Sequence, residues 1–208
     1  MKPWKIRRGA AMGWNLTEYK MTLGLVLLSG PVAVGKTSVA RALIEQFHFL
    51  DIRSGAYLRD LAAKRGKDTS RTTLQELGDS LDESTDFTWL VDEVAVAAIA
   101  KGPGQRLWLI DSVRKKRQVE HFRSRFGEAV LHVHLVAPEE ILRARYDARL
   151  SAGGEYEGNV PYEVAVKHPN EISSRGLEKI ADSIVDVNRS TPDRAAQEIA
   201  GLCDQRRL

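Results

Sequence analysis

Residues 30–37 read Gly-Pro-Val-Ala-Val-Gly-Lys-Thr and fit the pattern G-x-x-x-x-G-K-[ST] at every fixed position. A short, continuous apolar run, Leu23–Ser29, comes directly before them and is typical of a buried parallel strand. Residues 36–47 follow, with apolar side chains along one stripe, which is the spacing of an amphipathic helix. The sequence therefore predicts a strand, a glycine-rich turn and a helix in immediate succession.

A glycine-rich turn between a strand and a helix is suited to binding phosphate. Glycines let the backbone wrap closely around phosphate, and successive N–H groups together with the helix N-terminus supply positive potential. Lys36 is expected to reach the β- and γ-phosphates of ATP, and Thr37 to offer its hydroxyl to Mg²⁺. The predicted ATP-binding residues are Gly30, Pro31, Val32, Ala33, Val34, Gly35, Lys36, Thr37 and Ser38. Because such loops serve kinases, motors, GTPases and ATPase switches alike, the motif indicates only the phosphate donor.

Strands and helices alternate along the rest of the chain. Further strands are expected at Phe49–Ile52, Leu107–Ile110, Val130–Val136 and Ser183–Val187. Helices are expected at residues 56–65, 72–81, 87–100, 119–126, 138–150 and 172–181, and again after Thr191. This alternation predicts an α/β three-layer fold with a five-stranded parallel sheet.

Length and composition suit a single enzyme-sized domain. The chain has 208 residues, of which 43% are hydrophobic and 28% charged, values that are ordinary for a protein with a real core. We expect an N-terminal tail over residues 1–21 and one domain over residues 22–208, with acceptor-binding helices at about 54–100 and a lid at about 145–170. The lone cysteine, Cys203, excludes an internal disulfide and favours a reducing, cytoplasmic setting.

Net charge and hydropathy bear on whether the protein binds nucleic acid or a membrane. The net charge of +3 is too small to imply nucleic-acid binding by itself, although basic clusters leave nucleic acid open as a partner. No apolar run approaches the length of a membrane span. A small-molecule substrate is therefore the expected partner, while the oligomeric state is left open.

The segment Ser54-Gly55-Ala56-Tyr57-Leu58-Arg59 follows the second expected strand. It resembles the acceptor-binding segment of the nucleoside monophosphate kinase family, which includes adenylate, cytidylate and deoxynucleotide kinases. The resemblance implies that Ser54 and Gly55 open a helix and that Arg59, one turn later, clamps the acceptor phosphate. A planar guanidinium grips phosphate through two parallel hydrogen bonds, which explains the residue type. The alternative is a surface arginine on an ordinary helix.

A second match, Ile110-Asp111-Ser112-Val113-Arg114, follows the third expected strand. The resemblance implies that Asp111 holds Mg²⁺ beside Thr37 and that Arg114 also grips the acceptor phosphate. A carboxylate at the carboxyl end of a buried strand lies where such sheets bind ligands. The alternatives are a helix cap for Asp111 and a solvated run of basic residues for Arg114.

A third match is the pair Arg145 and Arg149, which lie four residues apart on one helix face, where like charges repel. Neither has an acidic residue three or four positions away, so an anion between them is expected. The resemblance implies that both surround the transferring γ-phosphate and that the Gly-rich residues 151–160 form a mobile lid over it. The alternative is a solvated basic face.

Asp51 leaves the type of acceptor open. It ends the second strand, where kinases that phosphorylate a hydroxyl often keep an Asp as general base, whereas a phosphate acceptor needs no base. Asp51 is equally explained as a cap or as an ion-pair partner of Arg53. The resemblance covers about residues 22–190 and is strongest to deoxynucleotide and dephospho-coenzyme A kinases. Ala56 departs from adenylate kinases, which have an Asp at this point.

The expected function is that of a kinase using Mg²⁺ and ATP, with a nucleoside or deoxynucleoside monophosphate as acceptor. Lys36, Arg145 and Arg149 would act at the γ-phosphate, in an in-line transfer without a covalent intermediate. One alternative is a kinase for a hydroxyl, on dephospho-coenzyme A or on a modified base in DNA. The other is a non-catalytic, nucleotide-gated switch, which would need no second phosphate clamp.

Overall fold

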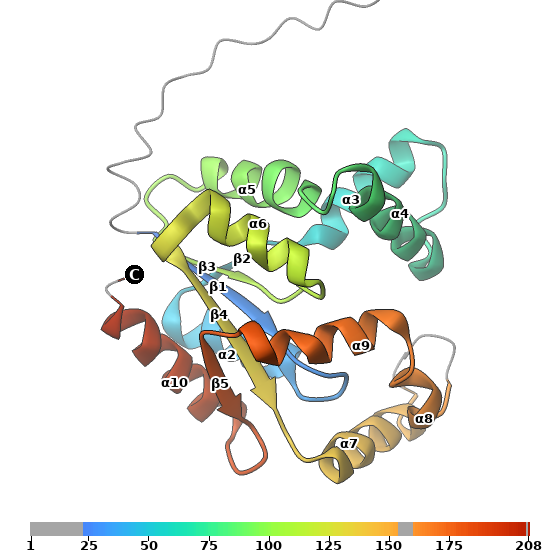
Figure 1. The fold of residues 1–208 in the computed structure, drawn as a ribbon, viewed down its shortest axis with the longest axis vertical. Helices are drawn as coiled ribbons and strands as arrows, with labels where there is room; N and C mark the ends of the chain where they lie inside the picture. Colours follow the sequence, from blue (N-terminus) through green and yellow to red (C-terminus); the bar gives the residue numbers. More distant parts are fainter. Residues whose placement is uncertain (1–22, 154–159, 207) are drawn as a thin grey trace, which may run out of the picture.

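The computed structural model describes residues 23–153, 160–206 and 208, so the expected tail, residues 1–21, and the centre of the expected lid lie outside the described residues. A five-stranded parallel sheet with the strand order β2-β3-β1-β4-β5 forms the middle of the molecule (Figure 1). Its strands are β1 (Gly24–Ser29), β2 (Leu50–Asp51), β3 (Leu107–Ile110), β4 (Val130–Val136) and β5 (Ser183–Asp186). The predicted α/β class with a five-stranded parallel sheet is confirmed.

Strand β1 is central and buried along its whole length. Val26 pairs with Leu109 of β3 on one side and with Leu131 of β4 on the other. Alternate residues of β1 enter different cores, Val26 and Leu28 on one face of the sheet and Leu25 and Leu27 on the other. A strand buried on both faces reads as a continuous apolar run, which is why it was recognisable in the sequence.

Helices cover both faces of the sheet. One face carries α2 (Lys36–Phe47) and α10 (Pro192–Gln205), whose apolar side chains share a core with β1, β4 and β5. The other face carries a π-helical segment, Leu90–Ala95, which continues into α5 (Val96–Lys101), and α6 (Lys116–Phe126). The three layers expected from the sequence are therefore present (Figure 1).

The remaining helices gather around the carboxyl ends of the strands. Helices α3 (Ser54–Lys64) and α4 (Arg71–Ser84) pack against each other on one side. Helices α7 (Glu139–Ser151), α8 (Tyr162–Ala165) and α9 (Pro169–Gly176) lie on the other side (Figure 1). Short 3₁₀ turns, Gly127–Ala129 and Leu177–Ile180, lead into β4 and β5.

Several helices differ from the predicted bounds, and for two of them the structure shows why. The helix expected from residue 87 begins after it, because Asp86 and Phe87 have positive φ angles of 49° and 65°, which an α-helix does not accept. The helix expected at residues 172–181 begins at Pro169, since His168 caps it by accepting the backbone N–H of Asn170 at 3.2 Å. Helix α8 was not predicted at all.

None of the helices in the described part of the chain combines the length and the apolar character needed to cross a bilayer.

Candidate active site

The turn between β1 and α2 has the backbone shape of a phosphate-binding loop. Gly30 and Gly35 have φ angles of 145° and 104°, which residues with a side chain rarely adopt. A Cβ on Gly30 would lie 2.7 Å from the carbonyl oxygen of Leu135, so that position has no room for a side chain either. The two glycines of the motif, Gly30 and Gly35, are therefore required by the backbone conformation of the loop.

The loop has donors ready for an anion. The backbone N–H groups of Ala33, Gly35, Lys36 and Thr37 donate to no other described residue. They surround the positive end of α2, which adds its dipole. The donor set therefore fits the phosphates of ATP.

Lys36 crosses the loop and makes its hydrogen bonds within it. Its Nζ donates to the carbonyl oxygens of Gly30 at 2.5 Å and Pro31 at 2.9 Å. Burial lowers the pKa of Lys36 to about 8, while the nearby carboxylates of Glu171 and Asp111 act in the opposite direction. A bound phosphate would supply the negative partner that this ammonium group lacks.

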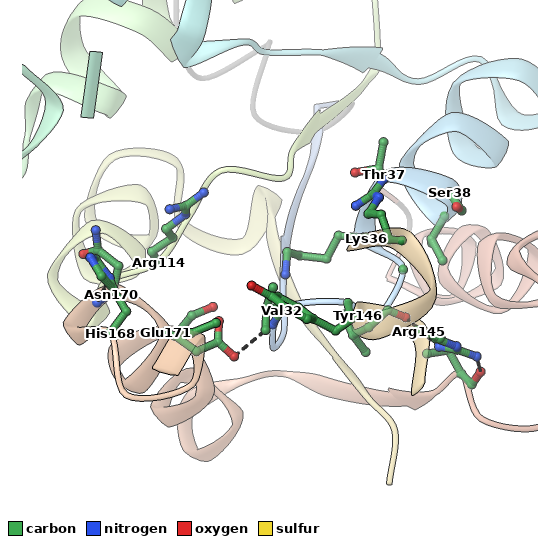
Figure 2. A pocket seen from close by; sticks show the side chains of 18 of the residues that line it. Val32, Lys36, Thr37, Ser38, Arg114, Arg145, Tyr146, His168, Asn170 and Glu171 are labelled. Carbon is green, nitrogen blue, oxygen red and sulfur yellow. Dashed lines mark hydrogen bonds between the residues drawn. The ribbon is translucent and has the colours of Figure 1, made fainter. Parts of the chain in front are cut away.

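A cavity of about 840 Å³ opens over the loop, within the range of ligand pockets. Figure 2 shows Lys36, Thr37, Ser38 and Arg145 on one side of it and Arg114 on the other. Its walls come from the loop, α4, α7, α8, α9 and the segments after β3 and β5. The residues in its lining that bear on the chemistry are Val32, Lys36, Thr37, Ser38, Arg71, Arg114, Arg145, Arg149, His168, Asn170, Glu171 and Ser174.

Arg145 and Arg149 both line the cavity, but they are not an unpaired couple. Arg145 donates from Nη1 to the carbonyl oxygen of Val34 and from Nη2 to that of Val187, both at 3.1 Å. The expectation that only an anion would partner this pair is therefore wrong for Arg145, because backbone carbonyls from distant segments accept its hydrogen bonds. Arg145 therefore connects the phosphate loop to the residue that follows β5. The catalytic roles of the two arginines stay predictions.

Arg114 lies on the loop after β3, and hydrogen bonds from the backbone of this loop to α6 hold it in place. Gln118 Oε1 accepts the backbone N–H groups of Arg114 at 3.0 Å and Lys115 at 3.2 Å. The Gln118 amide in turn donates to Asp82 of α4 at 3.2 Å. Arg114 is thus a built part of the cavity wall, which favours its predicted role over that of one more charge in a solvated run.

Thr37 and Asp111 offer oxygen ligands of the kind that Mg²⁺ prefers. Thr37 lines the cavity with an exposed side chain. Asp111 follows β3, the strand next to β1, and is exposed, but it is absent from the described lining of the cavity. Asp111 is close enough to Lys36 to favour the charged form of that amine. These two residues fit the predicted metal-binding role, which stays a prediction.

Other predicted acceptor residues are not brought to the cavity. Ser54, Gly55, Arg59 and Asp51 are absent from its described lining. The exposed Arg59 folds back along its own helix, with its guanidinium 3.6–4.0 Å from where a Cβ on Gly55 would stand. The Asp51 carboxylate accepts a hydrogen bond from Arg53, so of the two explanations for Asp51 the ion pair is the one observed.

Helix α9 contributes residues that the sequence did not single out. Glu171 Oε1 accepts the backbone N–H of Val32 at 2.9 Å and a hydrogen bond from Arg175 Nε at 2.8 Å. Ser174 Oγ donates to the carbonyl oxygen of Gly30 at 3.1 Å. The phosphate loop is therefore braced by a helix far along the chain. The only local signal was Pro169, which suits the first position of a helix.

A polar network joins α7, α8 and α9 below the cavity. Tyr162 donates to Glu139 Oε1 at 2.8 Å, and Arg175 Nη1 donates to Glu139 Oε2 at the same distance. Arg175 lowers the pKa of Glu139, and burial together with the bond to Glu139 raises that of Tyr162 to about 12. Tyr146 also donates to the carbonyl of Val160 at 2.9 Å. The chain is thus anchored on both sides of residues 154–159.

Solved structures of small-molecule kinases share this fold. A sugar kinase from Janibacter sp. HTCC2649 superposes with a TM-score of 0.51 at 16% sequence identity, over 88% of this chain and 95% of that one. A shikimate kinase from Aquifex aeolicus superposes with a TM-score of 0.51 at 13% identity, over 87% and 98%. At such low identity these likenesses show the fold alone.

Sequence comparison finds a more specific but shorter likeness. A cytidylate kinase from Methanocella arvoryzae is 36% identical over 69 residues, which is 33% of this chain and 37% of that protein. The match thus spans little more than a third of the relative's length. The family model AAA_18, described as an AAA domain, matches residues 26–163, which include most of β1, the phosphate loop and the strands β2 to β4. Since this match covers more than half of the chain, the protein belongs to the AAA_18 family of AAA domains.

Proposed function

We propose that the protein is an ATP-dependent phosphotransferase whose acceptor is a small phosphorylated molecule, namely a nucleoside or deoxynucleoside monophosphate. The observation that carries the proposal is the single cavity that joins the phosphate loop to arginines on three other segments of the chain. The partial likeness to a cytidylate kinase supports the choice of acceptor class. Such an enzyme would work in the cytoplasm, where Cys203 stays reduced.

The distribution of the arginines supports a site that binds two anionic substrates, a donor and an acceptor. Lys36 and the free N–H groups of the loop suffice for the phosphates of the donor. Arg71 at the start of α4 and Arg114 after β3 enter the cavity from other elements. A nucleotide-gated switch binds one nucleotide and needs no such additional charge, so the cavity favours a kinase over a switch.

The chemistry assigned to this site is in-line transfer of the γ-phosphoryl group. An acceptor phosphate oxygen forms the new P–O bond as the bond to the β-phosphate oxygen breaks, and ADP leaves with those electrons. Lys36 would hold the β- and γ-phosphates, and Arg114 the acceptor. Thr37 and Asp111 would hold Mg²⁺, which offsets phosphate charge when bound. Because a phosphate acceptor is already ionised, no general base is required.

The position of Asp51 weakens the hydroxyl-kinase alternative. A general base must lie within hydrogen-bond reach of the proton that it removes. The Asp51 carboxylate is bonded to Arg53 and is absent from the described lining of the cavity. The site as built therefore supports a phosphate acceptor better than the hydroxyl of dephospho-coenzyme A or of a modified DNA base.

The test is an acceptor screen with labelled ATP and Mg²⁺. The panel contains ribo- and deoxynucleoside monophosphates, dephospho-coenzyme A and DNA carrying a hydroxymethylated base, each with wild type, Lys36→Ala and Asp51→Asn. We expect a monophosphate to yield a diphosphate, Lys36→Ala to abolish the product, and Asp51→Asn to change kcat by less than about threefold. A hydroxyl acceptor with a loss of about 10²–10⁴-fold in Asp51→Asn would establish the alternative. Turnover that no acceptor stimulates would favour the switch.

A further inference from the structure

Asn170, in the first turn of α9, is largely buried, and its side chain lines the cavity without bonding to another described residue. The residue is 9% exposed, and in the described part of the chain its carboxamide makes no hydrogen bond. Only its backbone N–H is engaged, with His168 Nδ1. The carboxamide atoms are not among the fully buried polar atoms that lack a partner, so they remain accessible from the cavity that Asn170 lines and can bond to a ligand there.

The unpartnered amide lies in the wall of the cavity, on the side away from the phosphate loop. Figure 2 shows Asn170 and His168 with Arg114 on one side, and Lys36 and Thr37 on the other. The Arg114 guanidinium also makes no hydrogen bond or ion pair with a described residue. Two side chains with free donors therefore share one part of the cavity.

The donors in this part of the cavity favour an anion. The positive end of α9 adds potential, but its first N–H groups are already used, since Glu171 and Ile172 both donate to the carbonyl of His168. The binding groups are therefore side chains, a carboxamide and a guanidinium, which together suit the oxygens of a phosphate. We propose that Asn170 and Arg114 bind the phosphate group of the acceptor, an inference that rests on the proposed kinase function.

Glu171 explains why this phosphate is the acceptor's and not the γ-phosphate of ATP. Its carboxylate is bonded to the backbone of the phosphate loop at Val32 and lies between that loop and Asn170 in the view of Figure 2. Since Glu171 already accepts the Val32 N–H of the loop, we infer that a phosphate at Asn170 and a phosphate at Lys36 would be two separate groups. Both groups would open onto the same cavity, in which transfer from one to the other would occur.

The direct test measures by calorimetry the binding of inorganic phosphate to the protein after its phosphate loop has been saturated with Mg²⁺ and a non-hydrolysable ATP analogue. Wild type should bind one further phosphate. Asn170→Ala should weaken it about tenfold or more, the scale of a hydrogen bond to a charged group. Asn170→Asp should weaken it further because a carboxylate repels phosphate. If Asn170 had only a structural role, Asn170→Asp should bind phosphate better than Asn170→Ala, because Asp has the shape of Asn and suits the first turn of a helix.

The matched control is Ile172→Asp, which adds the same charge to the same turn at a side chain that is 59% exposed and outside the cavity lining. It should leave phosphate binding within about twofold of wild type. In kinetics, Asn170→Ala should raise the acceptor KM about tenfold and leave the affinity for the ATP analogue unchanged. A change in analogue affinity alone would assign Asn170 to the γ-phosphate and overturn the proposal.

The remaining outcomes separate the inference from the proposed function. Absence of a second phosphate on wild type, or equal binding by Asn170→Ala, overturns the inference even if an acceptor is phosphorylated. Phosphate binding that depends on Asn170, in a protein that no acceptor stimulates, supports the site and overturns the kinase function.

Discussion

At the scale of single residues, Arg145 and Arg149 of α7 both line the cavity, and each interacts with other residues. The Arg145 guanidinium donates hydrogen bonds to the carbonyl oxygens of Val34 in the phosphate loop and Val187 after β5. Arg149 lines the same cavity one turn later, nearer to residues 154–159 in the chain. Arg145 is thus positioned to support the bound donor, whereas Arg149 remains the candidate for charge that develops during transfer.

We therefore predict opposite kinetic effects for the two arginines. Arg145→Ala should mainly raise the KM for ATP, by about tenfold, because an interaction made equally before and during reaction contributes to binding alone. Arg149→Ala should mainly lower kcat, by about 10³-fold or more, the scale of an arginine at a transferring phosphoryl group. Steady-state kinetics with the best acceptor of the screen measures both. Arg143→Ala, on the same helix but bonded to Glu163 and outside the cavity lining, is the control. A kcat for Arg149→Ala within a few-fold of wild type would mean an ordinary basic surface.

At the scale of elements, α6 holds the Arg114 loop through one side chain. Gln118 is 5% exposed, accepts two backbone N–H groups of the loop and donates to Asp82 of α4. Trp89 Nε1 donates to the same Asp82 oxygen at 2.7 Å. Burial raises the pKa of Asp82 despite these donors, so this carboxylate depends on them. The position of Arg114 is therefore decided by contacts between helices.

Loss of the Gln118 hydrogen bonds should weaken binding of the acceptor and leave binding of ATP unchanged. Gln118→Leu is expected to raise the acceptor KM about tenfold, to leave the KM for ATP unchanged and to cost about 1–3 kcal/mol in the free energy of unfolding. The control is Gln105→Leu, which removes bonds to the carbonyls of His48 and Leu107 far from the cavity. It should lower stability without moving the acceptor KM. Equal effects of both variants on that KM would refute a specific role for Gln118.

At the scale of the whole molecule, a buried polar cluster couples stability to pH. Ser29 Oγ lies 2.7 Å from His132 Nε2 and 2.8 Å from His134 Nδ1, on neighbouring strands of the sheet. Both histidines are fully buried, and burial lowers the pKa of each to about 4 from 6.5. In the unfolded chain they take up protons below pH 6.5, whereas in the folded chain they stay neutral down to about pH 4. The unfolded state therefore gains stability as the pH falls through this window.

The free energy of unfolding should fall between pH 6.5 and 4, by up to about 3 kcal/mol for each histidine. Urea unfolding at a series of pH values measures it. His132→Asn and His134→Asn should each flatten this slope, whatever they cost at pH 7. His48→Asn is the control, because His48 is exposed and its left-handed backbone suits Asn. An unchanged slope in both buried variants would contradict the assignment.

Much of the architecture was predictable because it depends on local patterns. The strands Leu107–Ile110 and Val130–Val136 and the helix Lys36–Phe47 occur at the residues expected. Buried parallel strands need continuous apolar runs, and a helix on a sheet needs an apolar stripe, so both are visible without tertiary contacts. The start of the helix expected at residue 87 was missed since the positive φ angles of Asp86 and Phe87 leave no clear mark in the sequence.

By itself, the sequence determined the α/β fold and the phosphate loop, because glycines at fixed spacing between an apolar strand and an amphipathic helix have few other uses. Only the tertiary structure decided which charges share the cavity. It brought Arg114 to the cavity and left Arg59 on its own helix, and it added Asn170 and Glu171. Glu171 bonds to Val32 across 139 positions of the chain. Such contacts depend on how helices pack against a sheet, and no local pattern of residue types records that packing.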